Sequence, residues 1–433
     1  MTYPSAYQRH LCVILCFIAC ALPTATLALV PPANVECCQR KEYESPRCTQ
    51  FALSAAQCEK VYAEWVETYR RINAVQKPAL PSTIDTGLVA DMDRVMAEAG
   101  QSGFSGVVII GDATRVLFEK SIGFADERAR LPHSAAMRWR WASISKQVTA
   151  VIAAQLVAEG KLSLDATVGD YLTTAQFPAR YAKQITLRHL LQHTSGLPNP
   201  SDTETPSTAF PAFYRAKVTA DKVHREATRN ACAAVPKRAP GEYFEYNNCD
   251  YLVLAALIEQ VTGQRFADVL AARITAPLKL TSVELAEQAS SDKEQVKGYT
   301  SATQPEAEFN LATYGAAGAI TGSPQDLLAL DRALMGDTLL SAAMKKQFWN
   351  GNPKFGYAAL GVWSFPAALK GCKGAVDLIE RRGAIGGVQA RNIIAPTLSK
   401  AIVIFTNRAD WEFGEIWQGK GFAHELLSAA LCQ

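Results

Sequence analysis

The most informative part of the sequence is Trp141-Ala142-Ser143-Ile144-Ser145-Lys146, which leads into the segment 147–157. This segment is apolar nearly all round, a pattern that predicts a buried helix ending near Gly160. Ser143 and Lys146 stand three positions apart and share one helix face, where free N–H groups can hold an oxyanion and a buried lysine can act as a base. The alternative is an N-capping serine followed by a solvated lysine, but an unpaired ammonium would be costly on so apolar a helix.

A second group of polar residues follows a turn in the middle of the chain. Pro240-Gly241 opens the turn, and Tyr246-x-Asn248 places a phenol and an amide on one side of an extended loop. A tyrosine hydroxyl beside a lysine can hold a depressed pKa and exchange protons with a serine hydroxyl and a leaving group. The alternative is a tyrosine packed under the loop, with Asn248 satisfying a turn.

A third group, Arg381-Arg382-Gly383-Ala384, stands just before a predicted strand. A cation beside small residues lets a substrate approach the backbone closely. The alternative is a glycine-rich hairpin with two surface arginines. Adjacent strand residues alternate between faces, so Arg381 and Arg382 cannot both point into a site.

In this order and with these separations, the three groups resemble the serine β-lactamase and penicillin-binding-protein-like family, specifically its class C β-lactamase and esterase branch. Further stretches that resemble family landmarks are 185–198, 240–248, Ala317-Gly318 and Asp326-Leu327. The resemblance covers about residues 85–433. It implies a serine hydrolase that works through an acyl-enzyme.

The resemblance also implies a role for each matching residue. Ser143 is expected to be the acylated nucleophile, Lys146 its proton acceptor, and Tyr246 the shared base and leaving-group acid. Asn248 is expected to orient the lysine and the substrate. The backbone N–H groups of Ser143 and Ala384 are expected to form the oxyanion hole.

The third group departs from the family pattern. The family usually carries Lys-Thr-Gly or His-x-Gly, whereas this chain has Arg381-Arg382-Gly383. We expect Gly383 to let a substrate lie against the backbone and Arg381 to set substrate preference, because a guanidinium fork suits a carboxylate. The departure counts against β-lactams in particular as substrates.

The sequence on both sides of the middle region predicts strands. Two β-rich runs at 104–110 and 116–118 flank a glycine-containing turn, and two more occur at 391–394 and 401–405. Helices are predicted at 84–99 and about 421–431, and helical patterns alternate with proline-containing loops from about 165 to 300. The predicted fold class is therefore α/β (α+β): an antiparallel sheet built from both chain ends, flanked by helices, with a mostly helical inserted subdomain.

The first residues have the pattern of a secretory signal peptide. A basic start at Arg9-His10, an apolar run at 11–21 and small residues at 25–28 predict a signal over residues 1–28 and an exported protein. Lipid attachment at Cys20 is the less favoured alternative, because Phe17 stands where lipoprotein signals usually carry leucine. A Cys-containing extension of unassigned role is predicted for 29–83, and the hydrolase domain for 84–433.

Cysteine usage agrees with export. Of eleven cysteines, three lie in the signal segment, which leaves eight and therefore up to four disulfides. Cys232 and Cys249 flank the loop that carries Tyr246, and we predict a bridge between them. The four cysteines from Cys37 to Cys58 lack the paired CxxC spacing of a metal site, so local bridges are preferred there.

Composition and charge narrow the function further. The 433 residues are 48% hydrophobic and 20% charged, with 44 basic against 41 acidic residues, which is typical of a folded protein with no electrostatic reason to bind nucleic acid or a membrane surface. His189 and His193 are four apart, but no glutamate follows His189 as a zinc-protease helix requires, so neither metal nor cofactor is predicted.

The predicted function is an exported serine hydrolase acting on a small ester, an amide, a D-amino-acid peptide or a β-lactam. The alternative is a non-catalytic or slowly deacylating penicillin-binding or sensor-like module of the same fold. No membrane span is predicted in the mature chain, and the oligomeric state stays open.

Overall fold

The computed structural model describes residues 86–206, 209–286 and 296–432, together with single positions between 54 and 63. The chain divides into two compact units, and the second, which begins at Pro78, contains every element discussed below. The predicted signal peptide, Cys20, and Cys37, Cys38 and Cys48 lie outside the described residues. Those predictions, and the domain boundaries that depend on them, stay predictions. No helix in the described part of the chain is both long and apolar enough to span a membrane.

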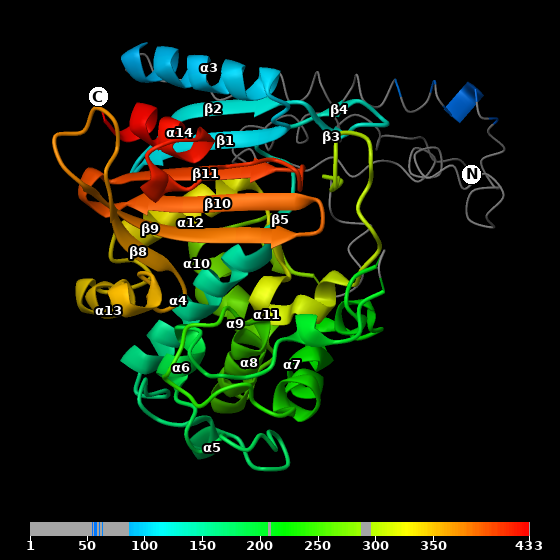
Figure 1. Ribbon diagram of the computed structural model, residues 1–433, viewed down its shortest axis with the longest axis vertical. Helices are drawn as coiled ribbons and strands as arrows, with labels where there is room; N and C mark the ends of the chain where they lie inside the picture. Colours follow the sequence, from blue (N-terminus) through cyan, green and yellow to red (C-terminus); the bar gives the residue numbers. More distant parts are fainter. Residues whose placement is uncertain are drawn as a thin grey trace, which may run out of the picture. The chain divides into compact units, whose positions relative to one another are not determined.

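A six-stranded antiparallel sheet with the order β2-β1-β11-β10-β9-β8 forms the centre of this unit (Figure 1). Its strands are β1 Gly106–Asp112, β2 Val116–Ile122, β8 Trp363–Ala367, β9 Val376–Ile385, β10 Val388–Ala395 and β11 Lys400–Thr406. The first and the last strand along the chain, β1 and β11, are neighbours in the middle of the sheet, with Gly106 opposite Thr406 and Asp112 opposite Lys400. The prediction that both chain ends build one antiparallel sheet is confirmed.

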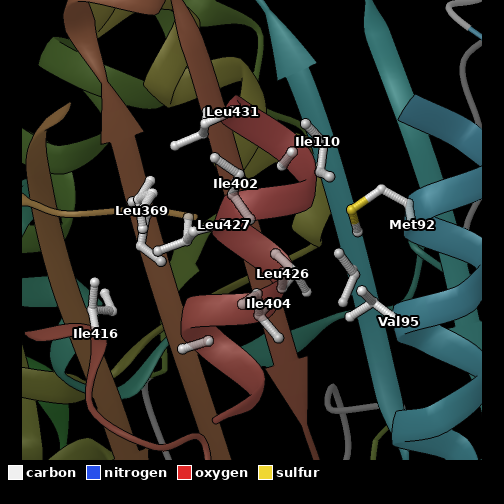
Figure 2. Packing of buried hydrophobic residues seen from close by; sticks show 14 of the residues in the cluster. Met92, Val95, Ile110, Leu369, Ile402, Ile404, Ile416, Leu426, Leu427 and Leu431 are labelled. Atoms are coloured by element: carbon white, nitrogen blue, oxygen red, sulfur yellow. The ribbon is translucent and has the colours of Figure 1, made fainter. Parts of the chain in front are cut away.

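One face of the sheet is covered by the helices at the two ends of the unit, α3 (Thr86–Gln101) and α14 (Phe422–Leu431). Alternate strand residues such as Ile110, Ile402 and Ile404 meet Met92 of α3 and Leu426 of α14 in one apolar cluster (Figure 2). These side chains are essentially inaccessible to solvent. Burying this much aliphatic surface is what fixes the two terminal helices against the sheet.

The opposite face is covered by α12 (Pro324–Met335), and α4 (Ser145–Ala158) reaches it where Asn392 Nδ2 of β10 donates to Gln147 Oε1 at 3.1 Å. Val107 and Ile109 of β1 point to this face and are also fully buried. A strand that is buried on both faces needs an unbroken apolar run, which is what the sequence 107–110 contains. Helix α4 is buried almost all round, as its apolar sequence predicts.

The middle of the chain is mostly helical, and in Figure 1 its helices group below the sheet, beyond β8 and β9. They are α5 Val168–Tyr171, α6 Leu187–Leu191, α7 Ala220–Arg229, α8 Asn248–Thr262, α9 Phe266–Leu270 and α10 Ala276–Leu278. Two short helices, α11 Gly315–Gly318 and α13 Ala342–Phe348, follow further along the chain. Smaller sheets join β3 (Phe124–Asp126) to β4 (Leu131–Pro132), and β5 (Trp139–Arg140) to β7 (Ile320–Gly322) and β6 (Glu284–Leu285).

Two local predictions need correction. The Arg381-Arg382-Gly383 group lies inside β9 rather than before a strand, because the strand already begins at Val376 and the polar residues within 376–382 obscured its pattern. Asn248 is the first residue of α8 rather than part of an extended loop, because the Asn247 side chain caps the helix by accepting from the backbone N–H of Cys249 at 2.7 Å.

Candidate active site

Ser143 lies in a single 3₁₀ turn, Ala142–Ile144, that leads directly into α4. The turn is fixed from behind, because the backbone N–H of Trp141 donates to the carbonyl of Ile320 at 2.9 Å. Ala142 adopts a left-handed φ of 48°, which a residue with a β-carbon tolerates only when its surroundings hold it there. The serine is thus presented by a backbone held out of its relaxed conformation.

The Ser143 hydroxyl receives two hydrogen bonds from side chains that were predicted to meet it. The Tyr246 hydroxyl donates to Ser143 Oγ at 2.6 Å, and Lys146 Nζ donates at 3.1 Å. These three groups come from the start of α4 and from the loop before α8, more than a hundred residues apart along the chain. The structure brings them within hydrogen-bond distance of one oxygen.

Lys146 is fully buried, and its other two donor contacts are also with protein groups. Its Nζ donates to Asn248 Oδ1 at 2.6 Å and to the carbonyl oxygen of Ala317 at 2.8 Å. Burial lowers the pKa of Lys146 to about 8, because the ammonium has lost its hydration. A lysine in this state can exchange a proton near neutral pH.

Tyr246 has a pKa that is lowered to about 8, for a different reason. Burial by itself would raise it, but the positive charges of Lys146 and Arg381 favour the phenolate and outweigh the loss of hydration. Arg381 Nη2 donates to the Tyr246 hydroxyl at 2.9 Å. The two residues that contact Ser143 Oγ therefore both titrate near the same pH.

Arg381 lies beneath the site and is 1% exposed. Besides the contact with Tyr246, its Nε donates to the carbonyl of Ser143 at 2.9 Å, and its guanidinium lies 5.0 Å from the centre of the Trp363 ring. These contacts give Arg381 a role in holding Ser143 and Tyr246. The expected role as a carboxylate clamp for the substrate stays a prediction.

Arg382, its neighbour on β9, points the other way and lines the cavity. Its guanidinium contacts Glu415 at 2.8 Å and Glu380 at 3.1 Å, and Glu380 also pairs with Arg391 at 3.1 Å. Arg381 and Arg382 have different surroundings because adjacent residues of a strand point to opposite faces of the sheet, as predicted.

Asn248 connects Lys146 to the helical region. Its Oδ1 accepts from Lys146, and its Nδ2 donates to the Tyr214 hydroxyl at 2.7 Å. Burial raises the pKa of Tyr214 to about 12, so this hydroxyl stays a neutral phenol. Tyr214 stacks on Tyr314 with 4.1 Å between ring centres. The sequence offers no motif that would have singled out Tyr214, which lies in a single short 3₁₀ turn, Ala212–Arg215.

The backbone of β9 comes very close to Ser143 at Gly383. A β-carbon placed on Gly383 would lie 2.5 Å from the carbonyl oxygen of Trp141 and 3.1 Å from the backbone nitrogen of Ser143. Only glycine permits this approach. Ala384, the next residue, lines the cavity together with Ser143 and Tyr246.

The cavity over Ser143 has a volume of about 760 Å³. Its walls combine aromatic and charged side chains, among them Trp363, Arg382, Trp411, Phe413 and Glu415. This is enough room for a small organic molecule or a short peptide end.

The two histidines considered as metal ligands have other contacts. His189 Nδ1 accepts from the backbone N–H of Thr186 at 3.2 Å, which completes the cap of α6. His193 lies beside Asp250, with 2.9 Å between its Nδ1 and Asp250 Oδ2. Within the described part of the chain, no three His, Cys, Asp or Glu side chains gather in a way that could hold a metal ion.

An antiparallel sheet flanked by helices, with a serine, a lysine and a tyrosine joined at its edge, defines the class of serine hydrolases with the β-lactamase fold. The Beta-lactamase family model matches residues 90–419, and the chain belongs to this family. The expected resemblance is confirmed.

Individual relatives agree with this assignment. The chain is 30% identical over 202 residues to esterase EstB of Burkholderia gladioli, covering 44% of this chain and 50% of the esterase. It is 25% identical over 264 residues to a penicillin-binding protein of Bacillus subtilis, covering 56% of this chain and 55% of that protein. The matched region thus spans about half the length of these curated relatives.

Solved structures show the same fold. The D-amino acid amidase of Ochrobactrum anthropi in complex with L-phenylalanine superposes with a TM-score of 0.65 at 22% identity, over 79% of this chain and 98% of the amidase. A penicillin-binding protein of Bacillus halodurans gives a TM-score of 0.59 at 22% identity, over 78% and 97% of the two chains.

Proposed function

We propose that this protein is an exported serine hydrolase that acylates Ser143 and then releases the acyl group to water. The observation that carries this proposal is the pair of short contacts on Ser143 Oγ, from Tyr246 at 2.6 Å and Lys146 at 3.1 Å. Both partners have pKa values lowered to about 8, so together they can accept and return a proton near neutral pH.

Each step of the proposed reaction uses a group already in position. Ser143 Oγ attacks the substrate carbonyl carbon while its proton passes to the Tyr246–Lys146 pair. The carbonyl oxygen becomes an oxyanion, held by the backbone N–H groups of Ser143 and Ala384. As the bond to the leaving group breaks, Tyr246 returns the proton to it. Water then repeats the sequence on the acyl-enzyme, with Tyr246 as the base, and releases the acid.

The proposed substrate class is a small ester or amide. Arg382 lines the cavity at the position where the family's Lys-Thr-Gly pattern has threonine, so the wall beside Ser143 is both bulkier and charged. That change counts against a substrate bound like a β-lactam. Among the relatives, EstB is named an esterase and the Ochrobactrum protein a D-amino acid amidase, which fits this class.

Export is supported by the cysteines. The described residues contain two bridges, Cys232–Cys249 and Cys372–Cys432, and Cys58 is also disulfide-bonded. Disulfides of this kind persist in oxidising compartments. Together with the basic and apolar N-terminus, they support a secreted or periplasmic location.

A fluorophosphonate probe tests the proposed nucleophile directly. The wild type should be labelled on Ser143, and Ser143→Ala should not be labelled. A panel of short acyl esters, D-alanyl peptides, amino acid amides and a chromogenic cephalosporin should then show turnover of the small esters or amides. Labelling without turnover of any of them would favour the slowly deacylating module, and absence of labelling would refute the proposal.

A further inference from the structure

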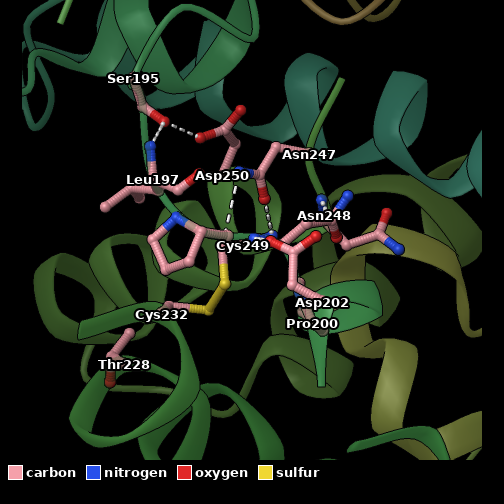
Figure 3. Close-up of a disulfide and its surroundings, with 12 residues drawn as sticks. Ser195, Leu197, Pro200, Asp202, Thr228, Cys232, Asn247, Asn248, Cys249 and Asp250 are labelled. Carbon is pink, nitrogen blue, oxygen red and sulfur yellow. Dashed lines mark hydrogen bonds between the residues drawn. A yellow bond between two sulfur atoms is a disulfide. The ribbon is translucent and has the colours of Figure 1, made fainter. Parts of the chain in front are cut away.

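Three buried polar side chains form a chain of hydrogen bonds next to Tyr246. None of the three lines the cavity. Ser195 Oγ donates to Asp250 Oδ1, and Asp250 Oδ2 lies 2.9 Å from His193 Nδ1. Figure 3 shows Asp250 at the start of α8 with Ser195 beside it. All three residues are buried, Asp250 completely. None of them has a role in the reaction described above.

The hydrogen bonds around His193 place the proton in this chain. The backbone N–H of Asn247 donates to His193 Nδ1 at 3.3 Å. A backbone N–H can only donate, so this bond favours the neutral imidazole with its lone pair on Nδ1 and its proton on Nε2, which is buried and has no hydrogen-bond partner among the described residues. The close contact between Nδ1 and Asp250 Oδ2 is then a hydrogen bond only if the carboxyl group supplies the proton.

We propose that Asp250 is a positioning residue that keeps its proton and donates it to His193 Nδ1, so that an uncharged Ser195–Asp250–His193 chain fixes Tyr246 for the proposed reaction. This step rests on the proposed function for its consequence in catalysis. The protonation state itself can be tested without any substrate.

Burial supports the uncharged form. It raises the pKa of Asp250 well above its ordinary value, and the hydrogen bond from Ser195 and the charge of Lys146 are too weak to reverse this. Burial also lowers the pKa of His193 well below its ordinary value, and the charges of Arg381 and Lys146 act in the same direction. The first turn of α8 would favour a carboxylate, but a helix start contributes less than full burial costs.

The chain reaches Tyr246 in two ways. The ring of His193 packs against the ring of Tyr246 with 4.6 Å between their centres. The Asn247 N–H that binds His193 belongs to the peptide group joining Tyr246 to Asn247, and the backbone of Glu245 donates to the carbonyl of His193 at 2.9 Å. His193 thus fixes the backbone on both sides of Tyr246.

His193 is itself held in an unfavourable conformation, with a left-handed φ of 58°. A residue other than glycine adopts this conformation only where neighbouring contacts hold it. The hydrogen bonds to Asp250 and Asn247 are such contacts. Loss of the Asp250 bond would therefore remove one of the contacts that hold the imidazole in place beside Tyr246.

The absence of charge on Asp250 also matters for Lys146. A negative charge at Asp250 would raise the pKa of Lys146, so less of the lysine would be present as the free amine near neutral pH. The ionisable groups that act on Asp250 are Lys146 and Glu245, and those that act on His193 are Lys146 and Arg381. With the acid neutral, Arg381 is the charged group outside the pair that acts on both Lys146 and Tyr246.

Infrared difference spectroscopy of the purified protein tests the protonation state. Asp250→Asn should remove one carbonyl band of a protonated carboxylic acid at neutral pH, and Ser195→Ala should shift that band by removing the bond it accepts. If Asp250→Asn instead removes carboxylate bands and leaves every acid band in place, the proposal is wrong. If Asp250→Asn does not fold, a Ser195→Ala variant in which no acid band shifts would overturn it too.

Kinetics test the positioning role. Asp250→Ala should lower kcat by about tenfold to hundredfold with little change in KM, because His193 loses its donor. Asp250→Asn should restore most of this loss without moving the pH profile, since an amide can donate to His193 and accept from Ser195 as a protonated acid does. An asparagine variant as slow as the alanine variant, or one whose acid limb moves to lower pH, would contradict a neutral Asp250.

Asp331 provides a matched control. It is another fully buried aspartate with a raised pKa, but it accepts from Asn392 Nδ2 at 2.7 Å, and neither residue lines the cavity or has a role in the proposed reaction. Asp331→Asn should remove an acid band of the same kind and leave kcat unchanged. If no substrate is turned over at all, the infrared result still decides the state of Asp250, so the failure of the proposed function is distinguishable from the failure of this proposal.

Discussion

Among single residues, Tyr246 is the one whose hydroxyl is acted on by the positive charges of both Lys146 and Arg381, and its pKa bears on the pH at which the proposed reaction can run. Arg381 Nη2 donates to it at 2.9 Å, and the same guanidinium lowers the pKa of both Tyr246 and Lys146. Below pH 8 the pair holds its protons, so kcat/KM should rise with pH through about 8. The arginine therefore sets the pH at which the proposed base becomes available.

Replacing Arg381 should move this rise. Without the guanidinium both pKa values increase, so in Arg381→Ala the acid limb of kcat/KM should shift to higher pH by about one unit. Arg382→Ala is the matched control, because Arg382 is paired with Glu380 and Glu415 and should leave the limb in place. A loss confined to acidic substrates, with an unchanged pH profile, would support the carboxylate clamp instead.

The two serines of the helix start should behave differently. Ser143→Ala should lower kcat by about a thousandfold or more, since it removes the proposed nucleophile. Ser145 Oγ instead accepts from the backbone N–H of Ile320 at 3.1 Å and is fully buried. Ser145→Ala should keep probe labelling and reduce the free energy of unfolding by about 1–3 kcal/mol, the cost of an unsatisfied buried donor. Denaturant unfolding and labelling of both variants check this, and a stronger loss of labelling in Ser145→Ala would show that the nucleophile is misassigned.

Among the secondary-structure elements, β9 and the turn before α4 must lie close together for the proposed oxyanion hole, because its two backbone N–H groups belong to Ala384 and Ser143. A β-carbon on Gly383 would meet the Trp141 carbonyl at 2.5 Å, so Gly383→Ala must push the strand away from Ser143. We expect kcat to fall at least about a hundredfold, as for loss of an oxyanion donor, with a smaller change in KM.

Gly374, in the loop before β9, is the control for this substitution. A β-carbon there would have no neighbour within 4 Å, so Gly374→Ala should be silent in steady-state kinetics and thermal unfolding. Equal activity of Gly383→Ala and the wild type would rule out the proposed oxyanion hole.

The bridge Cys232–Cys249 ties the start of α8 to the segment after α7, and Cys249 directly follows Asn248 (Figure 3). The predicted pairing is confirmed. The bridge closes a loop with a sequence separation of 17 residues. Loop closure of this length contributes about 3 kcal/mol to the free energy of unfolding.

Removing this bridge should affect activity before it affects the fold. In Cys232→Ser/Cys249→Ser, kcat should fall at temperatures where circular dichroism still shows the native state, because Tyr246 and Asn248 lose a nearby restraint. Cys372→Ser/Cys432→Ser removes the other bridge, which ties α14 to the segment between β8 and β9. That control should lower Tm without changing kcat at low temperature. Parallel loss of activity and structure in both variants would contradict a local role for Cys232–Cys249.

Most elements next to the site could be predicted from the sequence, because their signals are local. The apolar run after Lys146 and the strands near 107–110 and 401–405 are regular patterns, and the Ser143, Tyr246 and Arg381 groups resemble a family in order and spacing. Contacts made across the molecule could not be predicted. These contacts depend on packing between distant segments, which no short sequence pattern indicates. They are the contacts made by the carbonyl of Ala317, the hydroxyl of Tyr214 and the carboxyl of Asp250. Arg381 and Arg382 were correctly separated by strand alternation, but which of them lines the cavity depends on which face of β9 meets Trp363 and Tyr246.

At the scale of the whole molecule, the site is held between two parts of the chain that are built differently. Ser143 and Lys146 come from the turn that packs against β9 and from the start of α4, whereas Tyr246 and Asn248 come from the mostly helical middle region. The contacts among Lys146, Asn248 and Ala317 join these parts around one ammonium group. The site is therefore complete only when both parts of the chain are folded and packed against each other.

The pairing of β1 with β11 has a consequence for how the chain acquires its structure. Gly106 lies opposite Thr406, so a central pair of the sheet joins segments 300 residues apart. Such pairing is slow to form, because a very long loop must close before any contact compensates for it. A growing chain cannot complete its sheet until β11 has left the ribosome, and a chain ending at Ser399 should stay unfolded and protease-sensitive. Under the proposed export, this delay keeps the chain unfolded until it has crossed the membrane.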